Sequence, residues 1–425
     1  MHLFFRHALA TVAISTCFAT AQESFGAEQK RLLVASFEEV WATVRDKHYD
    51  PELGGLDWQK AYEQYKPRIE AAASTDEGRN YINEMLGLLK QTHIQVYPAR
   101  VYNDLESGNV GDHAPGLDLR VLNGKAIVTQ VEPDSPAEAA GVRLGWEILK
   151  VDGKEIAPTI KRIEEFSRGL TKEMTMSRAV AGMIAGMPGT VAEIEFHNNR
   201  DKITLSLDRV APRGDKAKFG QMPEAYFWAE TKSTSEDIRI IRFNIWLNPE
   251  AVAVAFSRIL AESDRARGFI IDLRGNPGGI GGMAMGAAGW FTSQRGLKLG
   301  TMIMRGATLN FVVYPRSNAT NAPLAILVDG CSASTTEIFA GGMQALKRAR
   351  IFGTTTAGAA LPSAIVRLPN GDGFQYIMAN YISESGKQLE GLGVTPDEIV
   401  VLARSELLAG KDPVMDRAIA WIKSQ

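Results

Sequence analysis

Cysteine is scarce in this sequence, and so is any excess of charge of one sign. Its 425 residues include two cysteines, 47 Lys and Arg, and 49 Asp and Glu, which gives a formal net charge of −2. This balance argues against binding to a nucleic-acid backbone, which normally requires a strongly basic surface. Beyond residue 21, no run approaches the ~20 apolar residues of a membrane span. We therefore expect no nucleic-acid partner and no stable membrane insertion.

The first 21 residues have the order of a secretory signal peptide. Arg6 is their only Lys or Arg, an apolar stretch covers residues 8–18, and the segment ends on a small-x-small pattern. A lipid anchor on Cys17 fits less well, because the three residues before it lack the expected Leu and the final small residue. We expect an exported protein, periplasmic or secreted. After cleavage only Cys331 remains, so no internal disulfide is expected and stability must come from core burial.

With 45% hydrophobic residues, the chain is long enough for two or three domains with separate cores. Apolar residues recur at helical spacing from Leu33 onward, and Ser74 precedes Glu77 by the three residues of a capping box. We assign residues 29–95 to an N-terminal helical domain.

A second domain, rich in β-strands, is predicted over residues 114–210. Its short strands are separated by turns such as Asn123-Gly124, and a short helix is expected from Ser135 to Gly141. The expected strands cover 116–122, 126–131, 147–151, 192–197 and 202–207.

Strands and helices alternate over residues 220–425, which predicts an α/β core. A hairpin is predicted around Asn370-Gly371, and a last helix begins at Asp412-Pro413, with Asp as its cap. The other expected elements are strands at 238–246, 268–273 and 324–328, helices at 249–262 and 334–347, and hairpin strands at 364–368 and 374–382.

The strand at 268–273 runs into a glycine-rich loop. The segment reads Gly268-Phe-Ile-Ile-Asp-Leu-Arg-Gly-Asn-Pro-Gly-Gly-Ile-Gly-Gly282. Glycines let a backbone adopt positive φ and let its N–H groups approach a ligand closely. A P-loop is excluded because no Gly-Lys-Ser/Thr follows, and a dinucleotide turn fits poorly because Asn276-Pro277 interrupts the Gly-x-Gly pattern. A plain strand-to-helix turn is the alternative interpretation.

Ser334 lies where the next buried strand gives way to a helix. Ser334 and Glu337 have capping-box spacing, so a purely structural role as helix cap is one interpretation. A serine at a helix start also gains from free N–H groups and the positive end of the helix dipole, which suits a nucleophile. The spacing Gly330-x-Ser-x-Ser differs from the Gly-x-Ser-x-Gly elbow and argues against an α/β-hydrolase.

A serine nucleophile needs a base, and histidines are few. Beyond the leader the chain contains only His48, His93, His113 and His197. They are scattered without ligand spacing, so we expect no metal ion and no organic cofactor. His93 lies directly beyond the third predicted helix. For each of the four, a structural or surface role is the alternative interpretation.

Together these segments resemble the C-terminal processing peptidase family, serine peptidases with a PDZ domain, and within it the branch closer to the tricorn core protease. The glycine loop is similar to the family's Asp-Leu-Arg-x-Asn-x-Gly-Gly segment, and residues 332–337 to its nucleophile segment. Residues 390–397 are similar to the segment before its last core strand. The resemblance implies an α/β fold: a crotonase-like peptidase core of ββα units, an inserted PDZ-like β-rich domain and an N-terminal helical domain.

The resemblance also implies catalytic roles. Ser334 would be the nucleophile. In the processing branch the base is a lysine further along the chain, but Ala359 stands at that position, so a Ser-Lys dyad is excluded. The tricorn-like branch instead uses a histidine after the N-terminal helices, a neighbouring hydroxyl and a distant glutamate. His93, Thr92 and Glu390 match these positions, with Thr in place of the usual Ser.

The family's oxyanion hole lies at the last glycine of the loop and at the amide after the nucleophile, which correspond to Gly279 and Thr335. The β-rich domain resembles a PDZ domain, which could deliver the C-terminal tail of a protein substrate to the serine or act only as a lid. The residues at the position of its carboxylate-gripping loop are Gly116, Leu117, Asp118 and Leu119.

We therefore expect an exported serine endopeptidase that acts on protein or peptide substrates. One alternative is a catalytically silent family member that binds a peptide or an apolar ligand. Another is an esterase-like hydrolase, because the same nucleophile and oxyanion hole would serve any acyl group. If His93 is the base, activity should rise with pH near its unperturbed pKa of ~6.5, shifted by Glu390.

Overall fold

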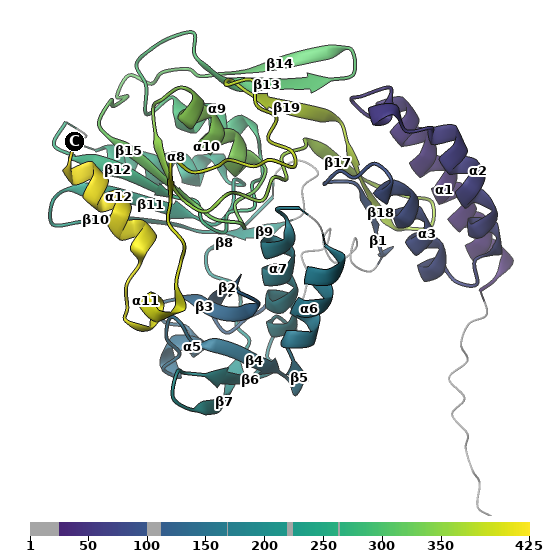
Figure 1. Ribbon diagram of the computed structural model, residues 1–425, viewed down its shortest axis with the longest axis horizontal. Helices are drawn as coiled ribbons and strands as arrows, with labels where there is room; N and C mark the ends of the chain where they lie inside the picture. Colours follow the sequence, from purple (N-terminus) through teal and green to yellow (C-terminus); the bar gives the residue numbers. More distant parts are fainter. Residues whose placement is uncertain (1–24, 100–111, 168, 219–223, 262–263) are drawn as a thin grey trace, which may run out of the picture.

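The computed structural model describes residues 25–99, 112–167, 169–218, 224–261 and 264–425, and the expected signal peptide lies outside these ranges. In Figure 1 the chain forms a helical layer, a small β-rich body and a large α/β body, which lie side by side. Each body has an apolar cluster of its own. Among the described residues, no helix is both long enough and apolar enough to cross a membrane.

The helical layer comes from the N-terminal part of the chain. Ser74 caps its third α-helix by accepting a hydrogen bond from the Glu77 N–H at 3.1 Å, which confirms the helix start predicted there. Phe37 and Ile82 are fully buried between the helices. The elements are α1 (Ala27–Lys47), η1 (Leu53–Gly55), α2 (Trp58–Ala71) and α3 (Thr75–Gly87).

These helices pack on a hairpin from the far end of the chain, formed by β17 (Ser363–Arg367) and β18 (Gly373–Ile377). The strand that follows α3, β1 (Gln95–Tyr97), adds to β18 in antiparallel register. A buried ion pair at 2.9 Å joins Arg79 of α3 to Asp372 in the hairpin turn. The segment between α3 and β1, which contains His93, is thereby fixed to the C-terminal half of the protein.

The predicted strand 374–382 is wrong in one respect, because it is two strands. β18 ends at Ile377, and β19 (Ala379–Ser383) joins a separate sheet with β13 (Lys298–Met304) and β14 (Ala307–Val312). The β13–β14 hairpin was not predicted.

The β-rich body contains one main sheet with strand order β2-β3-β4-β6-β7, so β2 and β7 are its edges. Helix α7 packs against β2. The five strands of the main sheet were predicted to within a few residues, and so was the short helix α5, whereas β5, α6 and α7 were not predicted. The elements are β2 (Leu117–Leu122), β3 (Lys125–Val131), α5 (Pro136–Ala139), β4 (Glu147–Val151), β5 (Lys154–Glu155), α6 (Ala157–Phe166), α7 (Lys172–Ile184), β6 (Val191–His197) and β7 (Lys202–Asp208).

The α/β body is built on a sheet with strand order β10-β11-β12-β15-β16-β20, in which all pairs except β10–β11 are parallel. Helices α8, α9 and α10 cover one face, and α12 covers the other. The elements are β10 (Ala229–Ser233), β11 (Ile238–Phe243), α8 (Pro249–Leu260), β12 (Gly268–Asp272), α9 (Gly282–Ala288), β15 (Leu324–Val328), α10 (Thr335–Ala345), β16 (Arg350–Gly353), β20 (Glu398–Ile399) and α12 (Pro413–Lys423). Smaller elements are β8 (Asp215–Ala217), β9 (Ala225–Phe227) and α11 (Arg404–Leu408).

This topology brings the two chemistry-bearing segments together. β12 and β15 are neighbours, with Asp272 opposite Leu327, and both are fully buried. The glycine loop follows β12 and the Ser334 turn follows β15, so both leave the sheet at its carboxyl edge. That edge is where open α/β sheets usually bind ligands.

Candidate active site

Ser334 occupies a strained turn between β15 and α10. Its backbone has φ +57° and ψ −119°, a region that non-glycine residues rarely adopt and that is found most often at functional sites. The glycine loop lies directly against it, since a Cβ added to Gly278 would come within 2.6 Å of the Ser334 Cβ and 2.9 Å of the Thr335 nitrogen. Only glycine therefore fits at 278, where φ is +97°.

The Gly279 and Thr335 amides are neighbouring free donors. Within the described chain, neither N–H donates to a protein acceptor. The groups around them are held: the Trp246 carbonyl accepts from Ile280 at 2.7 Å, and the Thr335 hydroxyl donates to the Gly279 carbonyl at 2.9 Å. Two fixed and unpaired amides beside a serine can donate hydrogen bonds to a developing oxyanion.

Thr92, His93 and Glu390 form a hydrogen-bonded chain. The Thr92 hydroxyl lies 2.7 Å from His93 Nδ1 and 3.0 Å from Glu390 Oε2, and the Thr92 N–H donates to Glu390 Oε1 at 2.8 Å. With Glu390 ionised, the hydroxyl donates to the carboxylate, so Nδ1 must be the protonated ring nitrogen. This tautomer leaves the Nε2 lone pair available to take a proton.

The electrostatics of His93 differ from the sequence expectation. Burial lowers the pKa of His93 to about 4, and the positive charge of Arg178 on α7 acts in the same direction. Burial raises the pKa of Glu390, against the hydrogen bonds from Thr92 and Ala360. The expected activity limb near ~6.5 therefore moves down in pH, and the ring is neutral at pH 7.

One loop, residues 356–360, connects the two halves of the site. Its Ala359 carbonyl accepts from the Ser334 N–H at 2.9 Å, and the next amide, Ala360, donates to Glu390 at 3.0 Å. Glu337, fully buried below the turn, accepts four hydrogen bonds at 2.6–3.0 Å. Burial raises the pKa of Glu337 to about 7, although all four bonds act to lower it. The four donors are the Ser334 N–H, the Thr356 hydroxyl and the Gly358 and Ala359 N–H groups.

The hydrogen bond between the serine and the histidine of such a site is not formed in this structure. Across the described residues, no hydrogen bond joins the Ser334 hydroxyl to the His93 ring. Catalytic hydrogen bonds are often long without substrate and tighten only in the complex. The loop at 356–360 contacts the Ser334 N–H on one side and Glu390, the hydrogen-bond partner of Thr92, on the other.

The candidate peptide-binding segment lies at the start of β2, an edge strand of the β-rich sheet. Gly116 has φ +81°, and Leu117 begins β2. Two edge amides are already paired: Leu119 N–H donates to the Asp118 carboxylate at 2.8 Å, and Val121 N–H donates to the Ser177 hydroxyl on α7 at 3.1 Å. A peptide strand added here would have to displace these side chains.

The other histidines lie elsewhere. His48 is buried and bonded to Gln91 at 2.9 Å, His113 contacts Asp112, and His197 contacts Arg404. Sequence reasoning missed Arg178, and it missed two further residues, Arg120 and Asp329, that hold the Ser334 turn. β2 reads Leu-Asp-Leu-Arg-Val-Leu, so its two charged residues alternate with apolar ones as in any half-exposed strand, and the sequence held no specific signal for Arg120.

Comparison with known proteins finds matches among proteases. Residues 237–400 match the model of Peptidase family S41, and residues 35–87 match the Tricorn protease C1 domain. The carboxyl-terminal-processing proteases of Picosynechococcus sp. and Synechocystis sp. are 26% and 28% identical, each over 89% of this chain, and 84% and 82% of their own lengths are covered. The solved structure of a photosystem II D1 C-terminal processing protease, 22% identical, superposes with a TM-score of 0.59 over 90% of this chain and 98% of its own, which shows the same mixed α/β fold. The chain therefore contains a region similar to Peptidase family S41 and an N-terminal region similar to the Tricorn protease C1 domain, and curated proteins similar to it are carboxyl-terminal-processing proteases.

Proposed function

We propose that the protein is a serine endopeptidase with Ser334 as nucleophile and His93 as general base. The observation that carries the proposal is the chain from Glu390 through Thr92 to His93, which is joined to the Ser334 turn by the loop at 356–360. This arrangement needs no lysine, in keeping with Ala359 at the position of the family's usual base.

The reaction follows from the assigned groups. Ser334 Oγ attacks the scissile carbonyl carbon while its proton passes to His93 Nε2, and the carbonyl oxygen becomes an oxyanion. The C–N bond then breaks as His93 returns the proton to the leaving amine, which leaves an acyl group on the serine. Water, deprotonated by the same imidazole, hydrolyses the ester.

Each supporting group has a defined role. The Gly279 and Thr335 amides stabilise the oxyanion, and the loss of one such donor typically costs ~3 kcal/mol in the transition state. Thr92 and Glu390 fix the ring and its tautomer, and the carboxylate stabilises the imidazolium that forms. Because His93 is neutral at pH 7, it is ready to accept the serine proton.

The same proposal covers substrate delivery, export and domain structure. We infer that the protein is exported and that a substrate's C-terminal tail adds as a strand to β2, with its carboxylate at Gly116–Leu119. The support for strand addition is topological, because β2 is an edge strand beside α7.

We also propose that residues 29–95, 114–210 and 220–425 are the domains, the second PDZ-like and the third crotonase-like.

The test compares wild type with Ser334→Ala on an unfolded protein substrate. We expect wild type to cleave and the variant to lose at least ~10³-fold in kcat. A peptide and a nitrophenyl ester measured side by side separate peptidase from esterase activity. Equal inertness of both proteins, with retained binding of a C-terminal peptide, would establish the catalytically silent alternative instead.

A further inference from the structure

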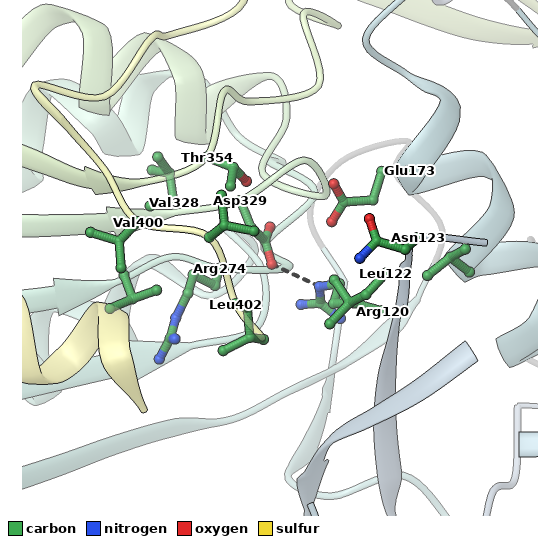
Figure 2. Close-up of a pocket in the computed structure, with 14 residues that line it drawn as sticks. Arg120, Leu122, Asn123, Glu173, Arg274, Val328, Asp329, Thr354, Val400 and Leu402 are labelled. Atoms are coloured by element: carbon green, nitrogen blue, oxygen red, sulfur yellow. Dashed lines mark hydrogen bonds and ion pairs between the residues drawn. The ribbon is translucent and has the colours of Figure 1, made fainter. Parts of the chain in front are cut away.

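A buried ion pair joins the β-rich body to the nucleophile turn. Arg120, on β2 and only 5% exposed, donates from Nε to the Asp329 carboxylate at 2.7 Å. The pair is part of the lining of a cavity of about 180 Å³, and Figure 2 shows it among lining residues that come from both bodies. Asp329 is the first residue after β15, five positions before Ser334. The pair therefore links strand β2 to the turn that carries Ser334.

The carboxylate of Asp329 ties two loops together. One of its oxygens accepts from the Gly275 N–H at 2.9 Å, in the glycine loop, and from the Cys331 N–H at 3.0 Å, in the nucleophile turn. Ser332, which is fully buried, donates to the carbonyl of Leu273 at 2.8 Å and reinforces the same connection. The glycine loop leads within four residues to the Gly279 amide, and the turn leads within three to Ser334.

Arg120 is positioned by contacts on both sides. Its Nη2 lies so close to Gly275 that a Cβ there would come within 2.0 Å of it. Its Nη1 donates to the Leu119 carbonyl at 2.7 Å and to Asp118 at 2.9 Å, which fixes the guanidinium on β2. Although burial alone would raise the pKa of Asp329, the charge and hydrogen bond of Arg120 hold it below its ordinary value, so the carboxylate stays ionised.

We propose that Arg120 and Asp329 are positioning residues for peptide hydrolysis. The pair sets the separation between the glycine loop, which supplies the Gly279 amide, and the turn that carries Ser334. This inference rests on the proposed function and adds that the β-rich body contributes to the catalytic geometry. A misplacement of 1 Å in such an arrangement can cost ~10²-fold in rate.

The test uses the full chain and the variants Asp329→Asn and Arg120→Lys. Asparagine keeps an oxygen for the Gly275 and Cys331 amides but faces the guanidinium with N–H groups, and lysine keeps the charge but loses the fork. We expect kcat on a fluorogenic peptide to fall ~10²-fold in Asp329→Asn and less in Arg120→Lys. KM should stay within about twofold in Asp329→Asn, because Asp329 lies outside the proposed peptide-binding segment.

A matched control separates positioning from loss of the interface. Arg404, on α11, also joins the two bodies, through the Gly145 and His197 carbonyls at 2.8 and 2.9 Å, but it touches neither catalytic loop. Arg404→Met should keep kcat within about twofold. The double variant Arg120→Met/Asp329→Asn leaves no unpaired buried charge, so it should fold and still show the low kcat.

Several results would overturn the inference. These are a kcat within threefold of wild type in both Asp329→Asn and Arg120→Lys, an equal loss in Arg404→Met, or recovery in the double variant. Amide hydrogen exchange provides a readout that needs no turnover. Residues 275–279 and 331–335 should exchange faster in Asp329→Asn than in Arg404→Met, and unchanged exchange would refute the inference. If wild type cleaves no better than Ser334→Ala, the proposed function fails, and exchange still decides the role of the pair.

Discussion

Replacing Thr92 by valine tests the hydrogen-bonded chain at its middle member. The two side chains have nearly the same shape, so Thr92→Val removes the hydroxyl and little else. In wild type that hydroxyl lies 2.7 Å from His93 Nδ1 and 3.0 Å from Glu390. The variant leaves the half-buried Nδ1–H without its acceptor and separates the carboxylate from the ring.

The size of the effect follows from the bond that is lost. A hydrogen bond linked to a charged group is worth ~1.5–3 kcal/mol, and each 1.36 kcal/mol of transition-state stabilisation is tenfold in rate. We therefore expect kcat to fall about 10- to 150-fold in Thr92→Val. A larger loss, towards ~10⁴-fold, would mean that His93 adopts the wrong tautomer, as occurs when the carboxylate of a Ser-His-Asp triad is replaced by an amide.

The assay is steady-state cleavage of a fluorogenic peptide, with Thr92→Ser as the matched control. Serine keeps the hydroxyl, so kcat should stay within a few fold of wild type, and KM should be unchanged in both variants because Thr92 does not contact substrate. Retention of full kcat by Thr92→Val would refute the role of the chain. An equal loss in Thr92→Ser would show that packing of the methyl group, rather than the hydroxyl, matters.

Two further predictions concern the base and the oxyanion hole. Because only neutral His93 can accept the serine proton, kcat/KM should rise with pH through about 4 and be level by pH 6; a limb near ~9 would point to a lysine base. A Cβ at Gly279 would come within 2.2 Å of the Trp246 carbonyl at φ +139°, so Gly279→Ala should displace the amide and lower kcat by ~10²–10³-fold. Gly282→Ala is its control, since the nearest atom to a Cβ there is 3.9 Å away, and equal activity of the two variants would contradict the assignment.

Local signals in the sequence predict much of the fold. The capping pattern at Ser74 and the proline after Asp412 mark helix starts that the structure contains. Long-range pairing is not encoded in this way. β1 joins β18, whose residues lie 278 positions further along, and no local pattern indicates that the predicted strand at 374–382 divides between two sheets.

The site shows the same difference between residues with a local signal in the sequence and residues whose role depends on long-range contacts. Ser334, His93 and Glu390 were predicted as site residues because their segments resemble motifs of the C-terminal processing peptidase family. Arg120 could not, because the reason for a buried arginine on β2 is a carboxylate 209 residues away. The sequence expectation for the pKa of His93 considered only Glu390, whereas the lowering comes from burial and from Arg178 on another body.

The absence of a lysine at position 359 and the presence of the hydrogen-bonded chain Glu390–Thr92–His93 are physically linked. Ala359 is 2% exposed and lies in an apolar cluster with Met174, Cys331, Ala333 and Ala357. An ammonium group in that cluster would lose its hydration, which is costly unless it is paired. The backbone of the same loop instead holds Glu337 and Glu390 through successive amides, and Glu390 holds Thr92. A loop that in the lysine-based branch would supply the base thus holds Glu390 here, and Glu390 is joined through Thr92 to the histidine that we propose as the base.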